Sequence, residues 1–123
     1  VEAGGADAVS LINTITGMKI DIRRKAFLLA NRTGGVSGPA IHPIAVRMVY
    51  EAANAVKVPV IGMGGIASAE GAIEMILAGA SAVSVGTANF YDPAVTMEIV
   101  DGIENYMKEQ GFDTVADMVG IVK

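Results

Sequence analysis

Residues 59–66 read Pro-Val-Ile-Gly-Met-Gly-Gly-Ile, a short apolar run that passes directly into a glycine-rich turn. Two other short apolar runs, residues 8–12 (Ala-Val-Ser-Leu-Ile) and 82–85 (Ala-Val-Ser-Val), have the same character. None of the three alternates cleanly between apolar and polar residues, which is typical of strands buried on both faces of a parallel sheet. We therefore expect three strands, over residues 8–12, 59–63 and 82–85.

Helical patterns separate and follow these strands. Pro43 opens one pattern at a position that suits a first helical turn, and Asp92 with Pro93 opens another. Ser68 is a good N-cap, and Gly79 follows the same segment where a left-handed residue ends a helix. The alternation of strand and helix predicts an α/β fold with a parallel sheet. We expect helices over residues 43–56, 68–78 and 92–109, and a short one over 114–119.

An internal repeat indicates the size of the expected fold. Residues 5–11 (Gly-Ala-Asp-Ala-Val-Ser-Leu) nearly match residues 79–85 (Gly-Ala-Ser-Ala-Val-Ser-Val). Because Gly79 ends a helix, we expect Gly5 to end one as well. A TIM (β/α)8 barrel needs about 250 residues, and this chain has 123. We therefore expect residues 1–123 to be the C-terminal half of such a barrel, about three βα units, with its N-terminal half absent.

The composition excludes several kinds of function. The chain has 9 Lys and Arg against 13 Asp and Glu, a net charge of −4, which argues against nucleic acid as a partner. No apolar run is long enough to cross a membrane. The chain has no Cys, which excludes thiolate metal sites and Cys nucleophiles within it, and no other metal-ligand cluster is visible. We expect a cytoplasmic protein without a metal site in this segment.

The turns after the second and third strands predict a phosphate site. Gly64 and Gly65 follow one strand, and Gly86 and Thr87 follow the next. Glycine lets backbone N–H groups approach an anion closely, and a helix that starts at Ser68 adds its positive end. The loops after the last two strands of a (β/α)8 barrel form its usual phosphate site. We therefore expect these two turns to bind a phosphorylated ligand together.

Further candidate residues follow the first strand. Asn13 and Thr14 can pair with a small planar polar substrate or cap the loop that follows. That loop, residues 17–38, is too long for a simple connection and predicts a lid or binding element. Its glycine-rich end at Gly38 could pass close to a flat ring or a ribityl chain. His42 is the only His, and we expect it to cap the helix at Pro43 rather than to catalyse.

Four motifs, in order along the chain, resemble the dihydroorotate dehydrogenase family. They are Asn-Thr-x-x-Gly-Met at residues 13–18, Asn-Arg-Thr-Gly-Gly-Val-Ser-Gly-Pro-Ala at 31–40, Ile-Gly-Met-Gly-Gly-Ile at 61–66 and Val-Gly-Thr-Ala-Asn-Phe at 85–90. More narrowly, they resemble the catalytic subunit of the NAD-linked, two-subunit class 1B. The resemblance covers essentially the whole chain.

The resemblance implies FMN-dependent oxidation of dihydroorotate to orotate, a step of pyrimidine (UMP) biosynthesis. Electrons would then pass to a partner subunit with FAD and a 2Fe-2S cluster, and on to NAD, within a heterotetramer built on a homodimer of catalytic subunits. The resemblance assigns substrate binding to Asn13 and Thr14. It assigns FMN binding to Ile12, Gly38, Gly64, Gly65, Gly86 and Thr87.

No catalytic residue can be assigned in this segment. The family's catalytic base is a Cys in the N-terminal part, and its flavin-contacting Lys also lies upstream. Lys19 and Lys25 are not substitutes, because they lie in the loop rather than at a strand end. We expect the full-length protein to be an enzyme and residues 1–123 alone to be inactive. Two alternatives stay open: another phosphate-binding TIM-barrel enzyme, or an inactive half-barrel that only self-associates through its open edges.

Overall fold

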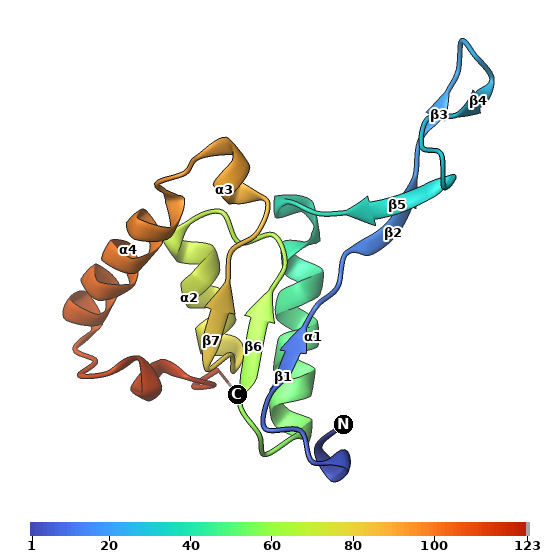
Figure 1. Ribbon diagram of the computed structural model, residues 1–123. Helices are drawn as coiled ribbons and strands as arrows, with labels where there is room; N and C mark the ends of the chain where they lie inside the picture. The colour runs from blue at the N-terminus through green and yellow to red at the C-terminus, as the bar shows by residue number, and fades with distance from the viewer. Residues whose placement is uncertain (123) are drawn as a thin grey trace.

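Three short strands pair in parallel at the centre of the computed structural model, which describes residues 1–122 (Figure 1). Strand β6 (Val60–Met63) lies in the middle, between β1 (Val9–Leu11) and β7 (Ala82–Ser84). In this register Gly62 lies between Leu11 on one side and Val83 on the other. The predicted strands and their parallel order are confirmed, with slightly shorter bounds.

The helices and short 3-10 turns fill the sequence between and after the strands. Helix α2 ends where the sequence predicts, because the backbone N–H of Gly79 (φ 125°) turns back to the carbonyl of Ile76. At its start the Ser68 hydroxyl accepts a hydrogen bond from the Gly71 N–H (3.4 Å). Gly5 (φ 88°) ends the first 3-10 helix, as the internal repeat predicts. The elements are η1 (Glu2–Gly4), η2 (Pro39–Ile41), α1 (His42–Ala55), α2 (Ala69–Ala78), α3 (Ala88–Tyr91), α4 (Val95–Gln110) and η3 (Val115–Met118).

Two of the four predicted helices differ in their start or their type, and the other two agree to within one residue. The helix expected over residues 92–109 begins at Val95, because Asp92, at the end of the separate short helix α3, has an extended backbone (φ −136°, ψ 102°). Asp92 therefore lies in the turn between the two helices, where its Oδ1 accepts from the Ala94 N–H (2.9 Å). The helix expected over residues 114–119 is a 3-10 turn in which Thr114 and Asp117 form a capping box.

The long loop predicted over residues 17–38 is an antiparallel β structure over most of its length. Strand β2 (Ile15–Met18) pairs with β5 (Thr33–Val36), and β3 (Ile20–Asp21) pairs with β4 (Ala26–Phe27). We call residues 15–36 the arm. The arm extends away from the rest of the molecule (Figure 1). Many of its apolar side chains are exposed: Ile15, Met18, Ile20, Ile22, Phe27, Leu28, Leu29 and Val36.

The core lies between the sheet and the helices. Helices α1 and α2 lie behind the sheet in the view of Figure 1, and α4 packs against α2. Along β6 the side toward these helices is buried at Val60 and Gly62, whereas Ile61 and Met63 on the other face are only half-buried. The largest fully buried side chains are those of Met75, Met118, Val49 and Val60. Among residues 1–122, no helix has both the length and the apolar character that a membrane span requires.

Candidate functional site

A cavity of about 340 Å³ opens at the carboxyl ends of the three parallel strands. Its walls come from the segments that follow β1, β6 and β7, from the start of η2, and from α3 and the beginning of α4. Seven of the predicted site residues line it: Ile12, Thr14, Gly38, Gly64, Gly65, Gly86 and Thr87. The sheet thus brings together residues as far apart in the sequence as Ile12 and Thr87, which are separated by 75 positions.

Asn13, the eighth predicted site residue, does not line this cavity. Its Oδ1 accepts a hydrogen bond of 2.8 Å from the backbone N–H of Thr14. Both residues are exposed at the end of β1. Asn13 therefore orients the neighbouring Thr14, which does face the cavity.

The turn at Gly64 and Gly65 needs glycine for two reasons. Both residues have positive φ angles, 126° and 71°, a region that other residues adopt only with strain. A Cβ at Gly65 would also stand 2.7 Å from the Gly38 carbonyl oxygen and 2.8 Å from the His42 Cβ. The turn is therefore packed directly against the start of α1.

Backbone N–H groups supply hydrogen-bond donors around the cavity. Within residues 1–122, the N–H groups of Gly65, Gly86 and Thr87 donate to no protein acceptor. A Cβ placed on Gly86 or Gly38 would meet no atom within 4 Å, so the backbone faces open space at both positions. Unused N–H groups beside open space form a site for an anion such as a phosphate.

Two hydroxyl groups connect opposite walls of the cavity. Thr87 Oγ1 donates to Ser37 Oγ across 2.9 Å, and both residues line the cavity. Ser37 belongs to the glycine-rich end of the predicted loop, but the sequence did not single it out, because its partner is 50 positions away.

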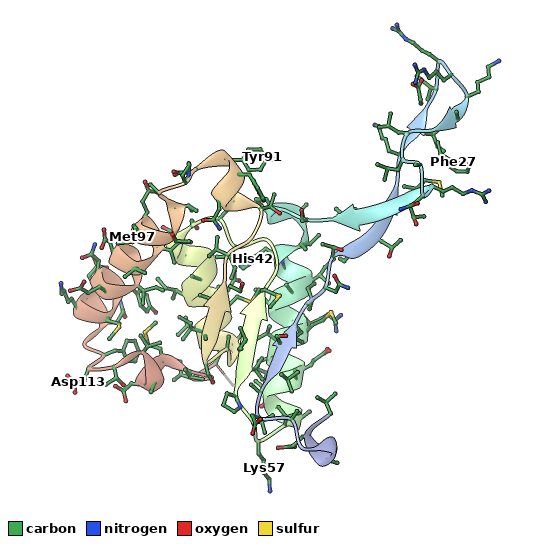
Figure 2. All side chains as sticks on the ribbon, viewed as in Figure 1. Phe27, His42, Lys57, Tyr91, Met97 and Asp113 are labelled. Carbon is green, nitrogen blue, oxygen red and sulfur yellow. The ribbon has the colours of Figure 1, made fainter. Side chains whose placement is uncertain are left out.

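His42 does not cap α1, and this prediction was wrong. The N-cap residue is Ile41, and no side chain caps that helix end. Figure 2 labels His42 at the start of α1. Its Nδ1 lies 2.9 Å from the carbonyl oxygen of Gly64, and its Nε2 lies 3.1 Å from Oε2 of Glu74. The ring therefore connects the glycine turn to α2.

The remaining walls are apolar or acidic. Within residues 1–122 no Lys or Arg lines the cavity, so the donors seen there are backbone N–H groups and hydroxyls. Tyr91, Asp92 and Glu98 line the side formed by α3 and α4. The sequence analysis missed these three because it did not expect helix α3 and assigned Asp92 and Glu98 to one helix over residues 92–109. In the part of the chain from residue 1 to 122, no group of three or more His, Cys, Asp or Glu is arranged to hold a metal ion.

A cavity at the carboxyl edge of a parallel sheet, with glycine turns after adjacent strands, defines an α/β protein that binds its ligand at the strand ends. The family model of dihydroorotate dehydrogenase matches residues 1–107. This chain belongs to the dihydroorotate dehydrogenase family.

Curated relatives of high identity support the same family. The chain is 62% identical over 122 residues to dihydroorotate dehydrogenase B (NAD(+)), catalytic subunit, of Lachnoclostridium phytofermentans, covering 99% of this chain and 41% of the relative. It is 58% identical over 118 residues to the protein of the same name from Alkaliphilus oremlandii, covering 96% of this chain and 39% of the relative. The chain thus spans about two fifths of the length of these relatives.

A solved structure shares the fold. The crystal structure of DHODH in complex with ferulenol from Eimeria tenella matches with a TM-score of 0.79 and 27% sequence identity. The match covers 98% of this chain and 32% of that one. The α/β fold expected from the sequence and the family resemblance are therefore both confirmed.

Proposed function

We propose that the full-length protein is the catalytic subunit of an NAD-linked dihydroorotate dehydrogenase, which oxidises dihydroorotate to orotate with FMN in pyrimidine (UMP) biosynthesis in the cytoplasm. The observation that carries this proposal is the cavity at the strand ends, where seven of the predicted site residues meet. The names of the curated relatives support the same activity.

Residues 1–123 would supply the last three βα units of a TIM (β/α)8 barrel. Three features support this architecture: the parallel order β1-β6-β7, the helices α1 and α2 on one face, and the less buried face at Ile61 and Met63. In a closed barrel that second face would line the interior. The outer edges of β1 and β7 would pair with strands from the rest of the protein, which removes two exposed sheet edges.

The cavity fits FMN. Its phosphate would accept hydrogen bonds from the glycine turns at Gly64–Gly65 and Gly86–Thr87, where the N–H groups of Gly65, Gly86 and Thr87 have no protein acceptor within residues 1–122. Ile12 and the open backbone at Gly38 would lie beside the flavin. FMN, when bound, would supply the hydride acceptor.

Asn13 and Thr14 would bind the pyrimidine substrate. Because Asn13 Oδ1 is occupied by the Thr14 N–H, the Nδ2 group of Asn13 is the end that can donate to a substrate carbonyl. The Thr14 hydroxyl faces the cavity and can donate or accept. These two side chains would orient the substrate, and the catalytic base would come from outside residues 1–123.

The arm would form part of a protein interface. Residues 15–36 hold five Lys or Arg and one Asp, a net charge of +4, while the chain as a whole has −4. Exposed apolar side chains alternate with these charges along the arm. A surface that is both apolar and charged suits contact with another subunit. It supports assembly as a homodimer within a heterotetramer whose second subunit carries FAD and a 2Fe-2S cluster.

A charge placed at Gly86 tests the phosphate site in the full-length protein. A side chain at Gly86 meets no protein atom within 4 Å at its Cβ, so the fold should tolerate Gly86→Glu and Gly86→Gln equally. The added carboxylate would repel the phosphate, whereas the neutral amide of the same size would not. We expect purified Gly86→Glu to lose FMN and Gly86→Gln to retain clearly more, measured by flavin absorbance per protein. Equal FMN content in the two variants would contradict the phosphate assignment.

A further inference from the structure

We propose that His42 is a positioning residue for the phosphate turn: its ring donates from Nδ1 to the Gly64 carbonyl and so aims the Gly65 N–H into the cavity. This inference rests on the proposed function, because it concerns how that site holds the phosphate of FMN.

The geometry of the peptide bond supports the first step. The Gly64 carbonyl and the Gly65 N–H belong to one planar peptide unit, and in a trans peptide they point in opposite directions. His42 Nδ1 lies 2.9 Å from the Gly64 oxygen. Anchoring that oxygen therefore fixes the direction of the Gly65 N–H. A hydrogen bond to the carbonyl also polarises the peptide and strengthens the N–H as a donor.

Glycine needs such an anchor more than other residues do. Gly64 and Gly65 have no side chains to limit their φ and ψ angles, and an isolated turn of this kind would sample many peptide orientations. The His42 backbone already contacts the turn, since a Cβ at Gly65 would lie 2.9 Å from the His42 nitrogen. Within residues 1–122, the His42 ring makes the one side-chain hydrogen bond to this peptide.

Both partners of the imidazole are acceptors. A carbonyl oxygen can only accept, so Nδ1 must carry a proton, and the Glu74 carboxylate 3.1 Å from Nε2 also requires a donor. The bond to Gly64 needs only the Nδ1 proton. The His42 side chain is 13% exposed and the Glu74 side chain 60% exposed, so the ring is held at the turn while its second partner is open to water.

Substitutions of His42 separate the two contacts in the full-length protein. In His42→Asn the amide Nδ2 takes the place of Nδ1 and can still donate to the Gly64 oxygen, but the contact to Glu74 is lost. His42→Phe fills the same space and makes neither bond. Arg47→Gln, on the same helix, is the matched control. The dissociation constant for FMN is measured by flavin fluorescence at one fixed pH, with the melting temperature of each apoprotein recorded alongside.

We expect His42→Phe to weaken FMN binding about tenfold, the range of one lost hydrogen bond. His42→Asn and Arg47→Gln should stay within about threefold of the wild type. If His42→Phe binds FMN as tightly as the wild type, or if His42→Asn binds as weakly as His42→Phe, the inference is overturned. An unchanged apoprotein melting temperature in His42→Phe separates a positioning role from a loss of folding.

A wild-type protein that binds no FMN would overturn the proposed function as well as this inference.

Discussion

Thr87 Oγ1 donates a hydrogen bond of 2.9 Å to Ser37 Oγ, and this bond connects the turn after β7 to the residue that follows the arm. Both residues line the cavity, so one contact links the wall formed by the sheet to the wall formed by the segment after β5. Because Ser37 accepts from Thr87, its own hydroxyl hydrogen is left to donate to a ligand. Ser37, the residue that follows the arm, is thereby part of the cavity wall.

This link predicts the behaviour of Ser37→Ala in the full-length protein. The change removes the acceptor for Thr87 and one donor at the cavity wall, and a hydrogen bond of this kind contributes about 0.5–1.5 kcal/mol. We expect FMN affinity to fall about fivefold, as measured by fluorescence titration. Ser81→Ala, at the opposite end of β7 and exposed, is the control and should bind FMN normally. Equal FMN affinity of the two variants would show that Ser37 does not contribute to FMN binding.

A second prediction concerns the packing of the glycine turn. In Gly65→Ala the new methyl group would stand 2.7 Å from the Gly38 oxygen and 2.9 Å from the His42 nitrogen, both backbone atoms, at a φ of 71°. Gly111→Ala places the same methyl group at a similar φ of 75° but with no atom within 4 Å. We expect Gly111→Ala to cost about 1 kcal/mol of unfolding free energy, the left-handed strain alone, and Gly65→Ala about 1–3 kcal/mol more. Urea unfolding of the full-length variants measures the difference, and similar midpoints for both would show that the turn is not tightly packed.

The sequence predicts the parallel sheet and the ends of α2 well, because local features determine them. The apolar runs around Val60 and Val83 have the composition of buried strands, and Ser68 and Gly79 each act within one helical turn. The glycine turns after β6 and β7 were predicted to lie together from the rule that parallel strands end at one edge of a sheet. The cavity they line agrees with that rule.

The wrong predictions concern residues whose structure depends on contacts with distant parts of the sequence. The residues next to His42 in the sequence suggest a helix cap, but the two hydrogen-bond partners of its ring lie 22 and 32 positions away. Asp92 looks like the start of a helix, and only the preceding turn α3 moves that start to Val95. The arm was expected as a loop because its strands are as short as two residues and pair only with each other.

A third prediction follows from the pKa of Glu104. A hydrogen bond and the charge of Lys108, four residues further along α4, lower the pKa of this carboxyl. A lowered pKa in the folded state means that the contribution to stability is present above the unfolded pKa and is lost as the pH falls through the folded one. We expect Glu104→Gln to be slightly less stable than the wild type at pH 7, with the difference lost as the pH falls below the ordinary range of a Glu carboxyl. Melting temperatures across this range measure it, with Glu109→Gln on the same helix as the control; a difference that persists at pH 3 would point to a cause other than the charge.

The last prediction tests the arm as an interface. Arg23, Arg24 and Lys25 stand at its tip, and Phe27 is labelled on it in Figure 2, whereas Lys57 lies at the far end of the molecule. Reversing the charges with Arg23→Glu and Arg24→Glu would leave the sheet untouched but turn a surface of net charge +4 neutral. Since complementary charge mainly raises the rate and specificity of association, we expect the double variant of the full-length protein to assemble more weakly, with a larger fraction of smaller species in native mass spectra at low salt. Lys57→Glu is the matched control and should assemble normally. If the double variant keeps the same assembly as Lys57→Glu at every concentration tested, the arm tip is not an interface.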